Sequence, residues 1–131
     1  MSGTEFGGRS IEQRSGAIIS LASINGWIGS SNEAHYCASK AGVMALTRAA
    51  AAEVGQYGIR VNAIAPGLVF NEYLAKIYPP GHFENYQERV PLGRTGKPDD
   101  IGDVAVFLAC DMSRYITGET ICVSGGSFMH H

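Results

Sequence analysis

Three short apolar runs recur along the chain, and residues that favour turns close each of them. The runs cover residues 17–21, 59–65 and 119–123, and the second stops at Pro66-Gly67. Short apolar runs that are bounded by glycine, proline or serine are typical of buried strands. The sequence therefore predicts three strands.

Two longer segments have the composition of helices. From about Ala34 to Val54 the chain is rich in alanine and apolar on nearly every side, which is typical of a helix buried on more than one face. A second helix begins at Lys97-Pro98-Asp99-Asp100 and ends near Cys110, because proline suits the first helical turn and acids suit its positive end. Residues 68–95 lack a clean period, so we expect one or two short helices with loops there.

Strands that alternate with helices predict a parallel sheet and an α/β fold. The chain has 131 residues, which favours a single domain, and we place it over residues 16–131. Residues 1–15 are polar and rich in glycine, so they are expected to form a leader outside the core. The alanine-rich helix should pack on the sheet on one side and on another subunit on the other.

Composition and charge narrow the classes of function. The formal net charge is -2, which gives no support to nucleic-acid binding. No apolar run approaches the ~20 residues that a membrane-spanning helix needs, and no secretory signal is visible. Cys37, Cys110 and Cys122 lack metal-ligand spacing, so we expect free buried thiols, no metal site and a cytoplasmic location.

Tyr36 and Lys40 form the most informative pair in the chain. They stand four positions apart in the predicted helix, and residues at this spacing lie on one helical face. An ammonium beside a phenol favours the phenolate, and such a tyrosine can exchange a proton with a substrate oxygen near neutral pH. Alone the pair is a weak signal, because tyrosine and lysine often meet at this spacing by chance.

Further segments make the signal specific, because they match one known family in order and in residues. With them the chain resembles the C-terminal half of a short-chain dehydrogenase/reductase. The resemblance implies a partial Rossmann-like fold, that is, a doubly wound parallel sheet with about three strands here and flanking helices. The matching stretches are G-A-I-I-S-L-A-S at 16–23, Y-C-A-S-K-A-G-V at 36–43, G-I-R-V-N-A-I-A-P-G at 58–67, R-T-G-K-P-D-D-I-G-D-V-A-V-F-L at 94–108 and I-T-G-E-T-I-C-V-S-G-G at 116–126.

The resemblance assigns three residues to catalysis. In the family a serine lies thirteen positions before the tyrosine, and Ser23 holds that position relative to Tyr36. Ser23 would bind the substrate oxygen, and Tyr36 would be the general acid in reduction and the general base in oxidation. Lys40 would bind the hydroxyls of the nicotinamide ribose. A serine at a strand end also caps turns, so this structural role stays an alternative for Ser23.

The same resemblance implies NAD or NADP as cofactor and a small alcohol or carbonyl compound as substrate. The family usually has a threonine where this chain has Asn71, whose amide can still donate and accept hydrogen bonds. Besides Tyr36 and Lys40, the expected cofactor contacts are Pro66, Gly67, Leu68, Val69 and Asn71.

One part of the family pattern does not occur in this sequence. The family's first half supplies a glycine-rich turn that holds the cofactor's pyrophosphate, and no such motif is found here. Three hypotheses follow: an NAD(P)-dependent oxidoreductase, a truncated and catalytically silent member that serves as an oligomerising or regulatory subunit, and a plain fragment. The strand at 17–21 would lack its usual outer neighbour, so we expect a homo-oligomer that associates through the 34–54 helix.

Residues 71–89 occupy the place of the family's substrate-covering lid, and we use that name for them. The segment is rich in aromatic side chains, and two interpretations of these are open. They either line an apolar substrate pocket or pack the lid together: Tyr73, Tyr78, Phe83 and Tyr86.

Overall fold

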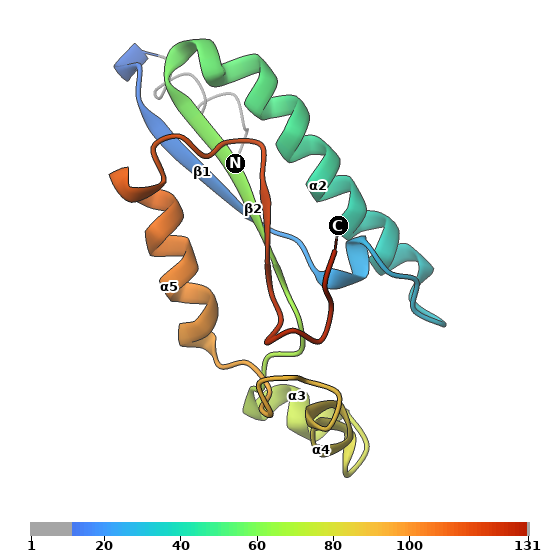
Figure 1. Cartoon of the computed structure of the whole chain (residues 1–131). Coiled ribbons are helices and arrows are strands. Elements are labelled where there is room, and N and C mark those ends of the chain that lie inside the picture. Colours follow the sequence, from blue (N-terminus) through green and yellow to red (C-terminus); the bar gives the residue numbers. More distant parts are fainter. Residues whose placement is uncertain (1–11, 131) are drawn as a thin grey trace.

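A parallel sheet forms the centre of the protein, with helices on its two faces (Figure 1). The structure is a computed structural model that describes residues 12–130. The strands lie side by side in the order β1-β2-β3 and comprise β1 (Gly16–Leu21), β2 (Ile59–Pro66) and β3 (Thr120–Val123). The predicted α/β class with three strands and flanking helices is confirmed. The predicted leader, residues 1–15, lies largely outside the described residues.

The register of the sheet brings the carboxyl ends of its strands to one edge. Leu21 of β1 pairs with Ile64 of β2, and Pro66 of β2 pairs with Val123 of β3. Ala22 donates its N–H to the carbonyl of Ile64 at 2.7 Å. Because alternate residues of a parallel strand bond to the same neighbour, the N–H and C=O of Leu21 point away from β2, toward the outer edge of the sheet.

Helix α2 (Ala34–Val54) has the predicted bounds and covers one face of the sheet. Its buried residues are Met44, Thr47 and Ala51, of which Met44 and Ala51 pack on the alternate residues of β2 that face it. The opposite face of α2 is exposed and carries mostly small side chains, one large apolar one, Leu46, and the polar His35 and Glu53. A single chain therefore covers only one side of this helix, which leaves the expected subunit contact as a prediction.

The end of α2 differs from a simple glycine stop. Gly55 keeps a helical φ of -58°, and the chain continues into the 3-10 turn η2 (Gly55–Tyr57). The turn ends at Gly58, whose φ of 74° lies in the left-handed region that favours glycine. The left-handed residue therefore comes at Gly58, four positions after the last residue of the helix.

Helix α5 (Pro98–Ala109) lies across the sheet from α2 (Figure 1). Its Leu108 is fully buried, and the chain passes from its end into the 3-10 turn η3 (Asp111–Ser113). The guanidinium of Arg60 in β2 donates to the carbonyl of Leu108 at 3.0 Å and to that of Cys110 at 3.2 Å. A cation that binds the last carbonyls of a helix satisfies groups that have no partner within the helix.

Asn62 holds the segment that leads into β3. Its side chain is 1% exposed, donates to the carbonyl of Ile116 at 3.0 Å and accepts from the N–H of Glu119 at 3.0 Å. These two bonds fix the turn before β3 against β2. The side chain thus provides the backbone partners that the ladder between β2 and β3 provides further along.

The lid contains two short helices, α3 (Glu72–Ile77) and α4 (His82–Gln87), as predicted. Its rings have close aromatic neighbours: Tyr78 stacks on His82 with 4.0 Å between centroids, and Phe83 meets Phe70, just before the lid, edge to face at 5.1 Å. Tyr73 instead is 72% exposed. Most of the aromatic side chains therefore pack the lid together.

Cys37, Cys110 and Cys122 are free thiols, and all three are half-buried rather than buried as expected. Within residues 12–130, no group of three or more His, Cys, Asp or Glu side chains is placed to hold a metal ion. The same part of the chain contains no helix that is long and apolar enough to cross a bilayer.

Candidate active site

Ser23 lies where β1 ends, at the carboxyl edge of the sheet. Its backbone is extended, with φ -163° and ψ 155°, and it caps the 3-10 turn η1 (Ile24–Gly26). The Ser23 hydroxyl accepts the N–H of Asn25 at 3.1 Å, and the residue is 8% exposed. Ser23 therefore does cap a turn, which is the structural role that the sequence left as an alternative. This role leaves the hydroxyl proton free to be donated, because the capping bond uses only an acceptor site.

The turn after Ser23 is tied to the start of α2. The Asn25 side chain donates to the carboxylate of Glu33 at 3.2 Å, and Glu33 is the residue before the first helical turn. Sequence reasoning did not single out Asn25 or Glu33. Eight positions and a loop separate the two residues, so no local period links them.

Tyr36 and Lys40 occupy the first turns of α2, on the face toward β1. The Lys40 Nζ lies 5.6 Å from the centre of the Tyr36 ring and donates to the carbonyl of Leu21 at 3.2 Å. Leu21 is two residues before Ser23, so this lysine joins the tyrosine to the end of β1. Tyr36 is 39% exposed, which leaves its side chain accessible to a ligand.

The segment after β2 carries the predicted cofactor residues, and most of its polar groups have partners. The N–H of Leu68 donates to the hydroxyl of Tyr86 at 3.2 Å, and the carbonyl of Leu68 accepts from Gly96 at 2.9 Å. Val69 and Gly96 form a parallel bridge, in which Gly96 bonds to the residues on either side of Val69, Leu68 and Phe70. The backbone groups of Val69 therefore face the opposite side, away from Gly96.

Asn71 combines two roles in this segment. Its side-chain oxygen accepts the N–H of Leu74 at 2.7 Å and caps α3, which leaves its two amide protons as donors. Gly67 is packed closely, because an added Cβ would lie 3.0 Å from the Tyr86 hydroxyl and 3.0 Å from the Cβ of Ser124. Packing alone thus accounts for glycine at this position.

These polar groups fit the nicotinamide end of a dinucleotide. Lys40 uses one of its three donors on Leu21 and keeps two for ribose hydroxyls. The backbone of Val69 and the amide of Asn71 suit a carboxamide, which both donates and accepts. For the pyrophosphate end, the sequence offers no glycine-rich turn.

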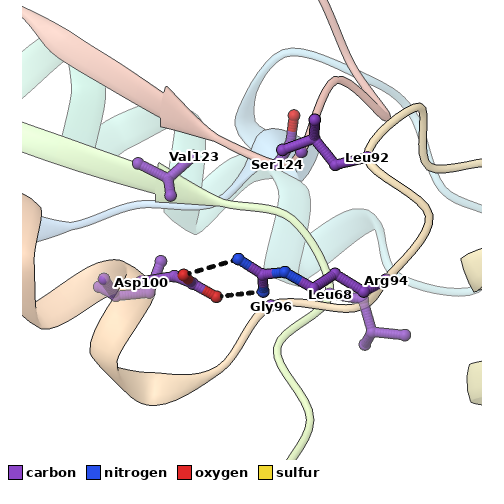
Figure 2. Close-up of a pocket in the computed structure, with 9 residues that line it drawn as sticks. Leu68, Leu92, Arg94, Gly96, Asp100, Val123 and Ser124 are labelled. Atoms are coloured by element: carbon purple, nitrogen blue, oxygen red, sulfur yellow. Dashed lines mark hydrogen bonds and ion pairs between the residues drawn. The ribbon is translucent and has the colours of Figure 1, made fainter.

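A separate cavity of about 140 Å³ lies between the ends of β2 and β3 and the start of α5 (Figure 2). Figure 2 shows the guanidinium of Arg94 facing the carboxylate of Asp100 across two bonds, of 2.6 Å and 3.0 Å. The arginine bond, with a second bond from the N–H of Lys97, lowers the pKa of Asp100 to about 2. Of the predicted site residues, only Leu68 lines this cavity.

A larger hollow of about 660 Å³ opens at the amino ends of β1 and β2, where Gly16 and Ile59 line it. None of the predicted site residues lines it. Ligands of open parallel sheets bind outside the carboxyl ends of the strands, which is where Ser23 and Lys40 lie. The site is thus an open face of the chain and coincides with neither hollow.

Known proteins share this sequence and this fold. A family model described as enoyl-(acyl carrier protein) reductase matches residues 5–127. The 3-oxoacyl-[acyl-carrier-protein] reductase FabG of Staphylococcus aureus (strain N315) is 44% identical over 119 residues. The chain belongs to the short-chain dehydrogenase/reductase family. The human (3R)-3-hydroxyacyl-CoA dehydrogenase, 43% identical over 114 residues, is a further relative of this family member.

Solved structures of the family superpose closely. A 3-oxoacyl-[acyl-carrier protein] reductase from Brucella melitensis gives a TM-score of 0.88 at 35% identity, over 94% of this chain and 46% of that one. A structure of such a reductase from Brucella melitensis with bound NAD gives 0.84 at 35% identity, over 94% and 45%. The matches to the Staphylococcus aureus and human relatives cover 91% and 87% of this chain but 48% and 43% of theirs. The chain thus spans about half the length of the curated relatives it matches.

Proposed function

We propose that this family member carries the proton-transfer residues of an NAD(P)-dependent oxidoreductase, which moves a hydride between nicotinamide and a carbonyl or alcohol substrate. The observation that supports this most is the position of Lys40. Its amine lies beside the Tyr36 ring and binds the backbone two residues before Ser23. The bond from Lys40 to Leu21 joins the start of α2, which carries Tyr36 and Lys40, to the end of β1, which leads to Ser23. It thus brings together a proton donor, a cation and a hydroxyl for the substrate oxygen.

The role of each residue in the reaction follows from the hydrogen-bond donors that it still has available. In reduction, the Ser23 hydroxyl donates a hydrogen bond to the substrate carbonyl oxygen and stabilises the charge that develops there. Tyr36 gives its phenolic proton to that oxygen, and Lys40 holds the ribose and stabilises the phenolate that remains. A bound nicotinamide would supply the hydride in this direction and accept it in the other.

The names of relatives guide the choice of substrate. They describe a 3-oxoacyl-[acyl-carrier-protein] reductase, a (3R)-3-hydroxyacyl-CoA dehydrogenase and an L-rhamnose 1-dehydrogenase. Two of these three act on an oxygen at carbon 3 of an acyl thioester, so a 3-oxoacyl thioester is the first substrate to assay. NAD and NADP are both candidates as cofactor, and we expect the reaction to take place in the cytoplasm.

A second candidate is a catalytically silent subunit that assembles with itself or with a longer relative. The exposed side of α2 is the observation that favours it. The open face of α2 would serve such assembly. Leu46 is 68% exposed there among alanines, and small residues let two helices approach closely.

Titration of the purified chain with NADH and with NADPH, followed by calorimetry, separates the two candidates. Binding tighter than about 1 mM supports the oxidoreductase, while a folded chain that binds neither nucleotide supports the silent subunit. Where binding occurs, Tyr36→Phe should abolish turnover of a 3-oxoacyl thioester with little loss of nucleotide affinity, because the variant keeps the ring and lacks only the hydroxyl. Tyr115→Phe is the matched control, because Tyr115 is fully exposed. Turnover that survives in Tyr36→Phe would remove this tyrosine as the acid.

A further inference from the structure

The hydroxyl of Tyr86 joins three segments that are far apart in the sequence. Tyr86 belongs to α4 of the lid, and its ring is half-buried. Its oxygen accepts the N–H of Leu68, after β2, at 3.2 Å and lies 2.8 Å from the hydroxyl of Ser127, after β3. Because one oxygen makes both contacts, loss of this single atom would release the lid from two neighbours.

The residues after β3, 124–130, form a segment that we call the strap. At its start, Gly125 and Gly126 have φ values of 64° and 92° and press on the residues that follow the lid. A Cβ added to Gly125 would lie 2.7 Å from the Cγ1 of Val90, and the Gly125 carbonyl accepts the N–H of Leu92 at 3.1 Å. The strap is therefore held against the lid region from its first residues on.

The other end of the strap reaches the turn that follows Ser23. The ring of His130 stacks on Trp27 with 4.3 Å between centroids and 17° between planes, and Phe128 stacks on it at 5.5 Å. Trp27 ends the turn η1, which Ser23 caps, and its N–H donates to Ile24 at 2.9 Å. Figure 1 shows the strap turning back near the lid and running toward η1 and α2.

We propose that the strap couples the lid to the Ser23 turn, and that Tyr86 is the positioning residue at its lid end. Movement of α4 away from the sheet must break the bond between Tyr86 and Ser127. The strap then stays held at Gly125, but its part beyond Ser127 loses its register against Trp27. In the function proposed above, this coupling would let lid closure set the position of the Ser23 hydroxyl. The coupling itself requires no cofactor and no turnover, so it can fail or hold independently of that function.

The experiment compares four variants of the full chain with the wild type, first by circular dichroism to confirm folding. Tyr86→Phe removes the hydroxyl and keeps the ring, and Ser127→Ala removes the same bond from the strap side. Ser127→Thr restores a hydroxyl. Tyr78→Phe removes a lid hydroxyl whose ring stacks on His82 and is the matched control.

Two readouts report the two ends of the strap. Hydrogen exchange at the Leu68 amide should become about fivefold faster in Tyr86→Phe, which is the loss of one hydrogen bond of ordinary net strength, and should stay unchanged in Ser127→Ala. Trp27 is the only tryptophan of the chain, so its fluorescence reports the far end without a label. Quenching by acrylamide should increase in Tyr86→Phe and in Ser127→Ala, and should return to the wild-type value in Ser127→Thr.

Two outcomes would overturn the coupling. Unchanged Trp27 quenching in both hydroxyl-deletion variants would mean that the strap is held at Trp27 by stacking alone. Unchanged Leu68 exchange in Tyr86→Phe would remove Tyr86 as the positioning residue. If Tyr86→Phe does not fold, the pair Ser127→Ala and Ser127→Thr decides the question through Trp27, since both retain the tyrosine.

Discussion

Replacement of Asn62 by alanine tests how this small sheet holds its third strand. The Asn62 side chain bonds the carbonyl of Ile116 and the N–H of Glu119, each at 3.0 Å, and is itself 1% exposed. Alanine removes both partners and leaves two backbone groups unpaired between β2 and the turn before β3.

The cost can be worked from those two groups. A buried polar group that loses its partner costs about 1–3 kcal/mol, so two of them sum to about 2–6 kcal/mol. Ile116 is half-buried and Glu119 is exposed, so water can reach both backbone groups in part. We therefore expect the lower part of this range, about 2–4 kcal/mol, which is a large share of the about 5–15 kcal/mol that stabilises a typical domain.

Urea unfolding followed by circular dichroism, at one fixed protein concentration, measures this loss. Asn85→Ala is the matched control, because Asn85 is exposed on α4 and should change the free energy of unfolding by no more than about 0.5 kcal/mol. If Asn62→Ala costs less than about 1 kcal/mol beyond Asn85→Ala, water replaces the two bonds and the side chain does not hold the strand.

Two further predictions concern charge and assembly. The bond from Arg94 lowers the pKa of Asp100 below its usual 3.8 to about 2, so the stability it contributes is complete above about pH 4 and is lost as the pH falls toward 2. Asp100→Asn should reduce the drop in urea midpoint between those pH values, and the exposed Asp103→Asn should not; equal drops in both would contradict the assignment. Leu46→Glu, on the open face of α2, should shift the expected oligomer to monomer in sizing chromatography, whereas Arg48→Glu on the opposite flank should not. A wild-type chain that already elutes as a folded monomer would refute this interface.

The elements of the fold could be predicted because local signals and burial agree along most of the chain. The helix at Ala34–Val54 and the start of α5 at Pro98 follow from composition and from proline in the first turn. The strands follow from short apolar runs, and each differs from the prediction by a single residue at one end.

The contacts that build the site were harder to predict, because they join residues far apart in sequence. The spacing of Tyr36 and Lys40 predicts a shared face, but it does not reveal that the lysine amine binds Leu21, nineteen positions away. The link from Tyr86 to Ser127 spans forty-one positions and depends on where the lid folds. Such pairings are set by the tertiary structure, and no local period carries them.

The bond between Lys40 and the Leu21 carbonyl has a consequence for any larger assembly. That carbonyl points to the outer edge of β1, where a further parallel strand would place its own N–H groups. An N–H of such a strand would compete with the lysine amine for the carbonyl, and it would release the amine where it replaces that bond. One backbone oxygen thus links the addition of a strand to the sheet with the position of the lysine amine. A strand added at this edge would change the amine's reach without touching Tyr36 or Ser23.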